Sequence, residues 1–140
     1  MRMRKQSGFT LVELLVVLAI IGLLAGLVGP RVLNQLAGAK SDTAKVQIRD
    51  FEQALEIYSL DIGEFPRTEQ GLEALIENPG NVSGWNGPYL RRNEIPLDPW
   101  NREYQYKYPG EHADFDITSL GADGKPGGDG DNADIGNWQL

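Results

Sequence analysis

The sequence predicts an α+β fold in which a long N-terminal helix, first transmembrane and then amphipathic, packs on a small antiparallel sheet with long loops. Residues 11–29 are apolar apart from Glu13, and residues 44–58 carry an amphipathic helical pattern. Residues 103–108 and 115–119 alternate in polarity, as half-exposed strands do. The 140 residues leave room for a single globular domain.

The composition argues against several classes of function. The net charge of −7 is unlike that of nucleic-acid-binding proteins, which gather positive charge against phosphates. The absence of cysteine excludes disulfides, thiolate nucleophiles and cysteine-based zinc sites. His112 is the single histidine, and no phosphate-binding loop, dinucleotide fingerprint or nucleophile elbow occurs. We therefore expect neither enzyme activity nor a nucleic-acid partner.

The first helix is predicted to cross a membrane once. Residues 1–8 carry three bases (Arg2, Arg4 and Lys5) and no acid, and the apolar segment 11–29 follows. As a helix that segment measures roughly 29 Å, close to the hydrocarbon thickness of a bilayer of about 30 Å. The basic flank favours a cytoplasmic N-terminus, which places the C-terminal domain on the other side.

A cleaved secretory signal is the alternative interpretation of the same segment. It too has a basic start and an apolar core, but this core is long and only Ala25-Gly26 offers a weak cleavage site. Glu13 also lies inside the apolar run, where a carboxylate costs about 2.5–3.5 kcal/mol at mid-helix. These features favour a retained helix, and the secreted alternative stays open.

Glu13 requires a partner if it lies within a membrane. It could reach the lipid headgroups by extending its side chain. Alternatively, cleavage after Gly8 would make Phe9 the new N-terminus, four residues before Glu13. In a staggered stack of helices, the α-amine of one chain could then face the carboxylate of the next and set the register.

The helix is predicted to continue beyond the membrane. Gly29-Pro30 predicts a kink or local melting near residues 26–30, because proline lacks the N–H that a helix needs. Beyond Arg31 the pattern is amphipathic. Its apolar face, predicted to pack on the chain's own core, consists of Ala44, Ile48, Phe51, Leu55 and Tyr58.

The second half is rich in loops. Turn residues at 61–66 end the long helix, and Thr68 is predicted to cap a short helix that runs through Glu77. Residues 79–102 read as a long loop, pinned to the core by three aromatic residues, Trp85, Tyr89 and Trp100. Two strands at 103–108 and 115–119 then form an antiparallel sheet on the amphipathic helix.

The segment 121–136 combines six glycines with four aspartates. Such a segment buries little apolar surface, so alone it should be a solvated tail. Calcium offers an alternative, because it binds carboxylate and backbone carbonyl oxygens together. Magnesium fits less well, since it requires a tighter octahedron and retains more water. Ile135 and Trp138 favour an ordered loop, because they provide apolar anchors after it.

Residues 5–14 (KQSGFTLVEL) resemble the cleavage and methylation site of type IV pilin-like proteins. The resemblance implies that a prepilin peptidase cuts between Gly8 and Phe9, that Phe9 is N-methylated, and that Glu13 guides assembly. Four further runs, at 68–72 (TEQGL), 87–90 (GPYL), 96–100 (PLDPW) and 119–124 (SLGADG), are similar to the major pseudopilins of type II secretion systems.

This resemblance implies a structural subunit of a periplasmic filament, the pseudopilus, that drives export of folded proteins across the outer membrane. It implies a single-pass protein of the inner membrane, with a cytoplasmic N-terminus and a periplasmic C-terminal domain. The implied partners are further copies in a helical homopolymer, minor pseudopilins, the prepilin peptidase, the inner-membrane assembly platform and membrane lipid. The alternative function is a soluble secreted calcium-binding module released from a signal peptide.

The resemblance also implies the division of the chain and a structural calcium ion. The expected parts are a leader (1–8), a transmembrane and filament-core helix (9–29), its amphipathic continuation (30–61) and a periplasmic part (62–140) with a calcium loop at 119–136. The expected ligands are Asp123 and the carbonyl of Leu120, then Asp131, and after these Asp129 and Asp134.

Overall fold

The structure is a computed structural model that describes residue 3 and residues 7–140, so the predicted leader bases lie outside the described residues. The chain divides into two compact units, Met1–Leu36 and Ala37–Leu140. The elements are the helix α1 (Leu11–Ile62), the 3₁₀ helices η1 (Leu72–Leu75), η2 (Gly130–Asn132) and η3 (Asn137–Gln139), and the strands β1 (Gln105–Lys107), β2 (Asp116–Ser119) and β3 (Ile135–Gly136).

The N-terminal half of α1 lies in the first unit, and its side chains are exposed. An 18-residue window of this helix has a mean hydropathy of 2.9, and none of it is buried, so it is long and apolar enough to cross a membrane. The helix passes through Pro30 without interruption, so the predicted local melting at 26–30 is not observed. Pro30 removes one helical hydrogen bond, and the intact turns on both sides keep the segment helical because helix propagation is cooperative.

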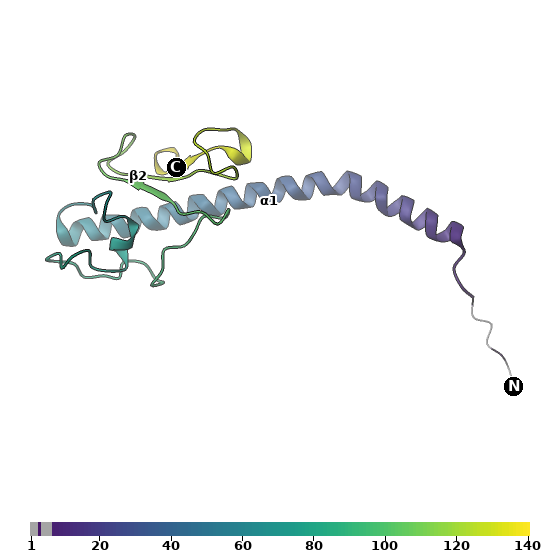
Figure 1. Ribbon diagram of the computed structural model, residues 1–140, viewed down its shortest axis with the longest axis horizontal. Coiled ribbons are helices and arrows are strands. Elements are labelled where there is room, and N and C mark those ends of the chain that lie inside the picture. Colours follow the sequence, from purple (N-terminus) through teal and green to yellow (C-terminus); the bar gives the residue numbers. More distant parts are fainter. Residues whose placement is uncertain (1–2, 4–6) are drawn as a thin grey trace. The chain divides into compact units, whose positions relative to one another are not determined.

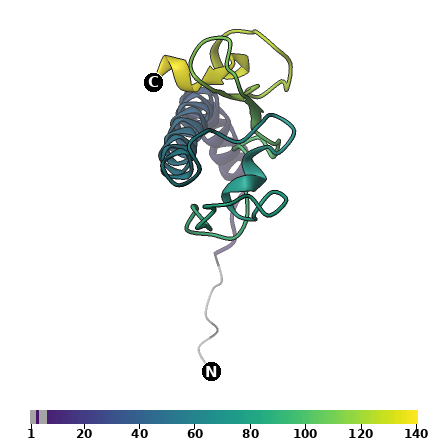
Figure 2. The ribbon, with the colours of Figure 1, turned by 90° about the vertical axis from the view of Figure 1, so that its left-hand side faces the viewer.

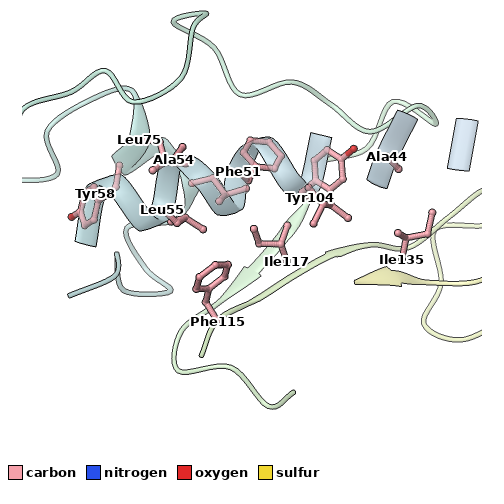
Figure 3. Packing of buried hydrophobic residues seen from close by; sticks show 13 residues of the cluster. Ala44, Phe51, Ala54, Leu55, Tyr58, Leu75, Tyr104, Phe115, Ile117 and Ile135 are labelled. Carbon is pink, nitrogen blue, oxygen red and sulfur yellow. The ribbon is translucent and has the colours of Figure 1, made fainter. Parts of the chain in front are cut away.

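The C-terminal half of α1 carries the core of the second unit. The predicted apolar face is buried, with Ala54 in addition to the five residues expected. Figure 3 shows Leu55 beside Ile117 of β2 and the preceding Phe115, and Phe51 beside Tyr104, with ring centroids 5.2 Å apart. Ile48, Leu55 and Ile117 are fully buried. The spacing of three and four residues places these side chains on one side of the helix, which explains why this side faces the sheet.

The sheet has the order β1-β2-β3 and is antiparallel throughout. Figure 1 shows β2 beside the C-terminal half of α1, and Figure 2 shows the following chain gathered on one side of that helix. Tyr106 lies opposite Ile117, and Ser119 lies opposite Ile135. Both predicted strands form, but they are shorter than the predicted ranges 103–108 and 115–119. The third strand was not predicted, because two residues are too few to show an alternation.

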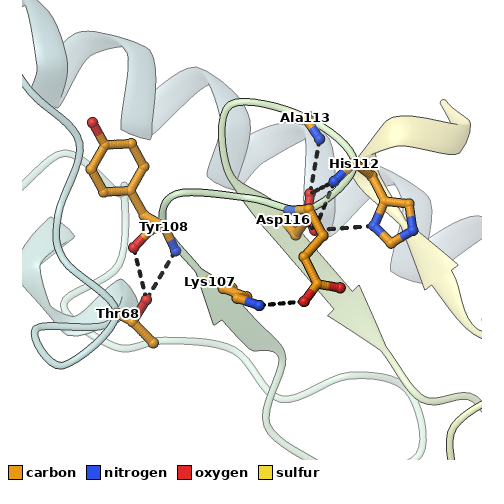
Figure 4. A network of polar contacts seen from close by, with 7 residues as sticks. Thr68, Lys107, Tyr108, His112, Ala113 and Asp116 are labelled. Carbon is orange, nitrogen blue, oxygen red and sulfur yellow. Dashed lines mark hydrogen bonds and ion pairs between the residues drawn. The ribbon is translucent and has the colours of Figure 1, made fainter.

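The short helix predicted from Thr68 through Glu77 is wrong in its extent. Only η1 forms, and Gly71 before it has φ of +66°, a conformation that an α-helix cannot contain. Instead of capping a helix, the Thr68 hydroxyl donates to the Tyr108 carbonyl and accepts from the Tyr108 N–H, at 3.0 Å each (Figure 4). Thr68 therefore ties the turn after α1 to the end of β1.

The long loop between η1 and β1 is pinned by aromatic side chains, as predicted. Trp85 and Tyr89 pack against the core, together with Trp100. The Trp85 indole N–H donates to the Ala74 carbonyl at 2.8 Å, and the Tyr89 hydroxyl donates to the Asp61 carboxylate at 2.8 Å. Each ring thus contributes apolar burial, and two of them add a directed hydrogen bond.

The turn between β1 and β2 is organised by one carboxylate, that of Asp116. It is 7 % exposed and accepts the backbone N–H groups of Glu111, His112 and Ala113, together with the His112 ring nitrogen (Figure 4). Burial opposes the charged form, but these hydrogen bonds outweigh it and hold the pKa of Asp116 below its ordinary value. The charged carboxylate is therefore part of the folded turn.

Replacing Asp116 by Asn should lower the free energy of unfolding at pH 7 by about 1–3 kcal/mol, because partly buried N–H donors lose one of two acceptor oxygens and the negative charge. Because the folded-state pKa is lowered, the contribution of the carboxylate is present above the unfolded pKa of about 3.9 and is lost as the pH falls below it. Denaturant unfolding at pH 7 and pH 3 measures both effects. Asp114→Asn, in the same turn but exposed, is the control. An undiminished difference at pH 3 would contradict this account.

Candidate functional site

The predicted processing site precedes α1 in an exposed, non-helical segment, residues 7–10. Phe9 is 85 % exposed, and a Cβ added at Gly8 would meet no atom within 4 Å. No contact within the described chain therefore requires glycine at position 8. The peptide bond between Gly8 and Phe9 is open to a protease, so the geometry is compatible with the predicted cut.

Glu13 has a role at the start of α1 that the sequence interpretation missed. The Glu13 N–H donates to the Thr10 hydroxyl at 3.2 Å, and the Thr10 N–H donates to the Glu13 carboxylate at 3.4 Å. This reciprocal arrangement is a capping box, and the spacing Thr10-x-x-Glu13 was the available signal. The negative carboxylate also interacts favourably with the positive end of the helix dipole. The pairing of Glu13 with the amine of a neighbouring chain stays a prediction.

The acidic loop, residues 120–134, is closed by the sheet. Because β2 and β3 are paired, Ser119 and Ile135 lie opposite each other at its two ends. The buried Ser119 hydroxyl donates to the buried carboxylate of Asp98 at 2.8 Å. At the other end, the Asn137 side chain accepts the Ile117 N–H at 2.8 Å and donates to the Phe115 carbonyl at 2.9 Å. Both ends of the loop are therefore fixed by buried polar bonds.

Within the loop, its two halves approach through the backbone. The Ala122 N–H donates to the Asp131 carbonyl at 2.8 Å. Gly121 has φ of +71°, and a Cβ there would lie 2.7 Å from the Ala133 carbonyl oxygen and 2.8 Å from that of Asp131. Glycine is thus required at 121 both by conformation and by the close approach of the opposite half.

The structure brings the predicted metal ligands into one loop without gathering their carboxylates. Asp123, Asp129 and Asp131 are exposed, and Asp134 is partly buried. Across residue 3 and residues 7–140, no three acid or histidine side chains come together as a metal-binding group. The Asp123 carboxylate accepts the Lys125 N–H at 3.0 Å. Leu120, whose carbonyl oxygen is a predicted calcium ligand, directly follows β2.

Asp134 is the acid whose surroundings fit a cation best. Its Oδ2 accepts the Gly127 N–H at 3.0 Å, while its Oδ1 is buried and has no hydrogen-bond partner. A buried carboxylate oxygen without a partner is destabilising, and a bound cation would remove that cost. The atoms that could bind a cation here are all oxygens, from carboxylates and backbone carbonyls, and calcium prefers such ligands. The predicted ligand set stays a prediction.

One further residue contacts the loop and was missed in the sequence. The Arg102 guanidinium Nη1 donates to the carbonyls of Gly121 at 3.0 Å and Ala122 at 3.2 Å. A Cβ at Gly124, which has φ of +65°, would lie 2.5 Å from the Arg102 Nε. Because Arg102 precedes these residues by about 20 positions, no local pattern could have indicated the contact.

Comparison with known proteins decides the family. The sequence model of the family described as "Type II secretion system (T2SS), protein G" matches residues 31–138. The chain belongs to this family. A second model, the prokaryotic N-terminal methylation motif, matches residues 3–29 and so includes Gly8, Phe9 and Glu13.

Individual members of the protein G family are similar over nearly their whole length. The type II secretion system core protein G of Pseudomonas aeruginosa is 49 % identical, with 99 % of each chain covered. That of Vibrio cholerae is 46 % identical, with 99 % of this chain and 96 % of the relative covered. The crystal structure of the major pseudopilin from the type 2 secretion system of enterohaemorrhagic Escherichia coli matches with a TM-score of 0.64 and 37 % identity. It covers 77 % of this chain and 94 % of that one. The predicted pilin-like fold is confirmed.

Gly124→Ala should destabilise the second unit by about 1 kcal/mol or more, because alanine is strained at positive φ and its Cβ meets the Arg102 side chain. Gly127→Ala is a matched control, since Gly127 also has positive φ (+79°) but open space around it. Thermal unfolding of both variants separates the two causes. If Gly127→Ala lost as much stability as Gly124→Ala, the Arg102 contact would contribute nothing.

Proposed function

We propose that this chain is the major structural subunit of a type II secretion pseudopilus, a periplasmic filament that drives export of folded proteins across the outer membrane. The observation that carries the proposal is the pair of matches that together span residues 3–138. The two units suit the role, since an exposed apolar helix is joined to a compact domain with its own core. The role is structural, not enzymatic.

Maturation in this proposal begins with a cut by a prepilin peptidase between Gly8 and Phe9, followed by N-methylation of Phe9. The exposed segment 7–10 and the absence of contacts around Gly8 support this assignment. Before assembly the chain is a single-pass inner-membrane protein, with its N-terminus in the cytoplasm and residues 62–140 in the periplasm. Its partners are further copies of itself, minor pseudopilins, the inner-membrane assembly platform and membrane lipid.

Assembly in this proposal depends on the charge of Glu13. In one chain the carboxylate caps α1 through Thr10, and its negative charge has no ion-pair partner among the described residues. The α-amine created at Phe9 carries the opposite charge and lies on the same helix end. When helices pack with a stagger, pairing the amine of one chain with Glu13 of the next neutralises both groups and sets the register.

Glu13→Gln should abolish filament assembly while leaving cleavage and membrane insertion intact. Glutamine preserves the capping box but removes the charge, so it separates the two roles of Glu13. Glu13→Ala, which removes both, should fail to the same extent. Filament yield by electron microscopy and N-terminal sequencing of the membrane-bound protein are the measurements. Wild-type filament yield from Glu13→Gln would assign Glu13 to capping alone and exclude the charge pair.

The same sequencing tests the alternative, a secreted module released from a signal peptide. A mature protein that begins at Phe9 supports the filament subunit, whereas a start near residue 27 supports the secreted module.

We also propose that the acidic loop binds calcium through the Leu120 carbonyl, Asp123, Asp131 and Asp134, with Asp129 as a further acid. The buried, unpartnered Oδ1 of Asp134 supports this, as do the fixed loop ends. The loop carries four aspartates and one base, Lys125, and the two positive charges of calcium would offset part of this excess of negative charge. Its role would be structural: the ion would order the loop against the sheet.

Removing calcium should lower the melting temperature of the full-length chain in detergent by on the order of 10 °C. A hundredfold excess of calcium over its Kd contributes about 2.7 kcal/mol, and each kcal/mol shifts Tm by about 4–8 °C in a domain near 100 residues. Asp134→Asn should weaken the response to calcium, and Asp114→Asn, outside the loop, should not. Magnesium should stabilise poorly. Superimposable curves with calcium and with chelator would show that the loop is a solvated segment.

A further inference from the structure

The backbone of Arg102 is held by hydrogen bonds to Asp98, and its side chain extends to the acidic loop. Its N–H donates to Asp98 Oδ1 at 2.8 Å, and its carbonyl accepts the Asp98 N–H at 2.8 Å. Asp98 is itself 3 % exposed, and its second carboxylate oxygen accepts the Ser119 hydroxyl. The base of the Arg102 side chain and the start of the acidic loop therefore share one buried anchor.

The Arg102 guanidinium contacts the backbone of the acidic loop and not the carboxylates of its aspartates. Nη1 donates to two successive carbonyls, those of Gly121 and Ala122. The guanidinium also lies so close to Gly124 that a Cβ there would force the Arg102 side chain to shift. Among the ion pairs formed by the described residues, none joins Arg102 to an aspartate of the loop. A positive charge is thus held in an acidic segment by carbonyl oxygens.

We propose that Arg102 is a positioning residue: it holds residues 121–124 in place without metal and thereby raises the calcium affinity of the loop. The second part rests on the calcium site proposed above. A glycine-rich loop has to be ordered before its oxygens can converge, and the apparent Kd is the intrinsic Kd divided by the fraction of chains already competent. By fixing residues 121–124, Arg102 increases that fraction.

The positive charge of Arg102 acts in the opposite direction, because it repels a second cation. Two observations favour the ordering effect. The contacts of Arg102 are hydrogen bonds of 3.0 and 3.2 Å to two successive backbone carbonyls, whereas charge repulsion across an exposed loop is screened by water and salt. The guanidinium also takes up only the carbonyls of Gly121 and Ala122, so the Leu120 carbonyl and the aspartates remain available. Arginine is suited to this position, since its planar group offers several fixed donors where lysine offers one point charge.

The test uses the full-length chain in detergent micelles, as wild type, Arg102→Gln and Arg102→Lys. Arg91→Gln is the matched control, because it removes the same charge at an exposed position outside the acidic loop. Hydrogen–deuterium exchange of peptides covering 119–124 and 125–134 is followed in chelator and in calcium. Calorimetric titration with calcium chloride gives Kd.

In chelator, wild-type residues 119–124 should exchange more slowly than residues 125–134, and Arg102→Gln should remove that protection. Its Kd for calcium should rise about tenfold, as expected if the competent fraction falls tenfold. Arg102→Lys should be intermediate, and Arg91→Gln should match the wild type in both measurements. Because a purely structural role would lower thermal stability without changing Kd, the affinity is the decisive readout.

Equal exchange of the two segments in wild-type chelated protein would overturn the holding role. An unchanged or lower Kd in Arg102→Gln would overturn the effect on affinity, since repulsion would then outweigh ordering. If the wild type bound no calcium at all, the calcium site and the affinity effect would both fall. The exchange comparison in chelator would still decide whether Arg102 holds residues 121–124.

Discussion

The packing of β2 on the C-terminal half of α1 determines the positions of the other two strands, the turn at Asp116 and the acidic loop. Ile117 is fully buried against the helix face that contains Ile48, Phe51 and Leu55. The same strand pairs with β1 on one side and β3 on the other, so it fixes both the turn at Asp116 and the ends of the acidic loop. Such short strands would not be stable without this apolar face.

Buried polar side chains supply the fixed points that a loop-rich domain without cysteine requires. Asp98 joins the 96–102 segment to Ser119, and Asn137 joins the last residues to Phe115 and Ile117. Asp116 gathers three backbone N–H groups of one turn. Each of these side chains satisfies backbone N–H groups that no strand pairing satisfies: loop groups for Asp98, turn groups for Asp116 and the Ile117 N–H for Asn137.

Sequence reasoning succeeded where a periodic pattern meets a large apolar surface. The helical spacing from Ala44 to Tyr58 predicted the core face of α1, because burial repeats with the period of the helix. The alternations at 103–108 and 115–119 predicted the first two strands. It failed where single residues decide. Gly71 at positive φ ended the helix expected from Thr68, and a two-residue strand at Ile135 carries no period at all.

The candidate site was predictable in part for the same reason. The motif at Gly8, Phe9 and Glu13 is contiguous, and the aspartates of the loop are dense in sequence. The contacts of Arg102 and the buried oxygen of Asp134 arise only from the fold, since they join segments that the sheet brings together. The family resemblance placed Asp134, together with Asp129, behind the other expected ligands, whereas its unpartnered Oδ1 makes it the best supported of the acids.

Glu13 and the acidic loop share one physical property: each carries negative charge that the described single chain does not fully neutralise. The Glu13 carboxylate has only a capping bond, and the loop has Arg102 held on carbonyls, with Asp134 Oδ1 left unpartnered. A carboxylate costs free energy when it lies in a membrane, as Glu13 would, or when an oxygen is buried without a partner, as in Asp134, until a partner arrives. In our proposals the partner of Glu13 is the amine of another copy, and the partner of the loop is calcium. Assembly and ordering would therefore both proceed by neutralising charge that the fold has already positioned.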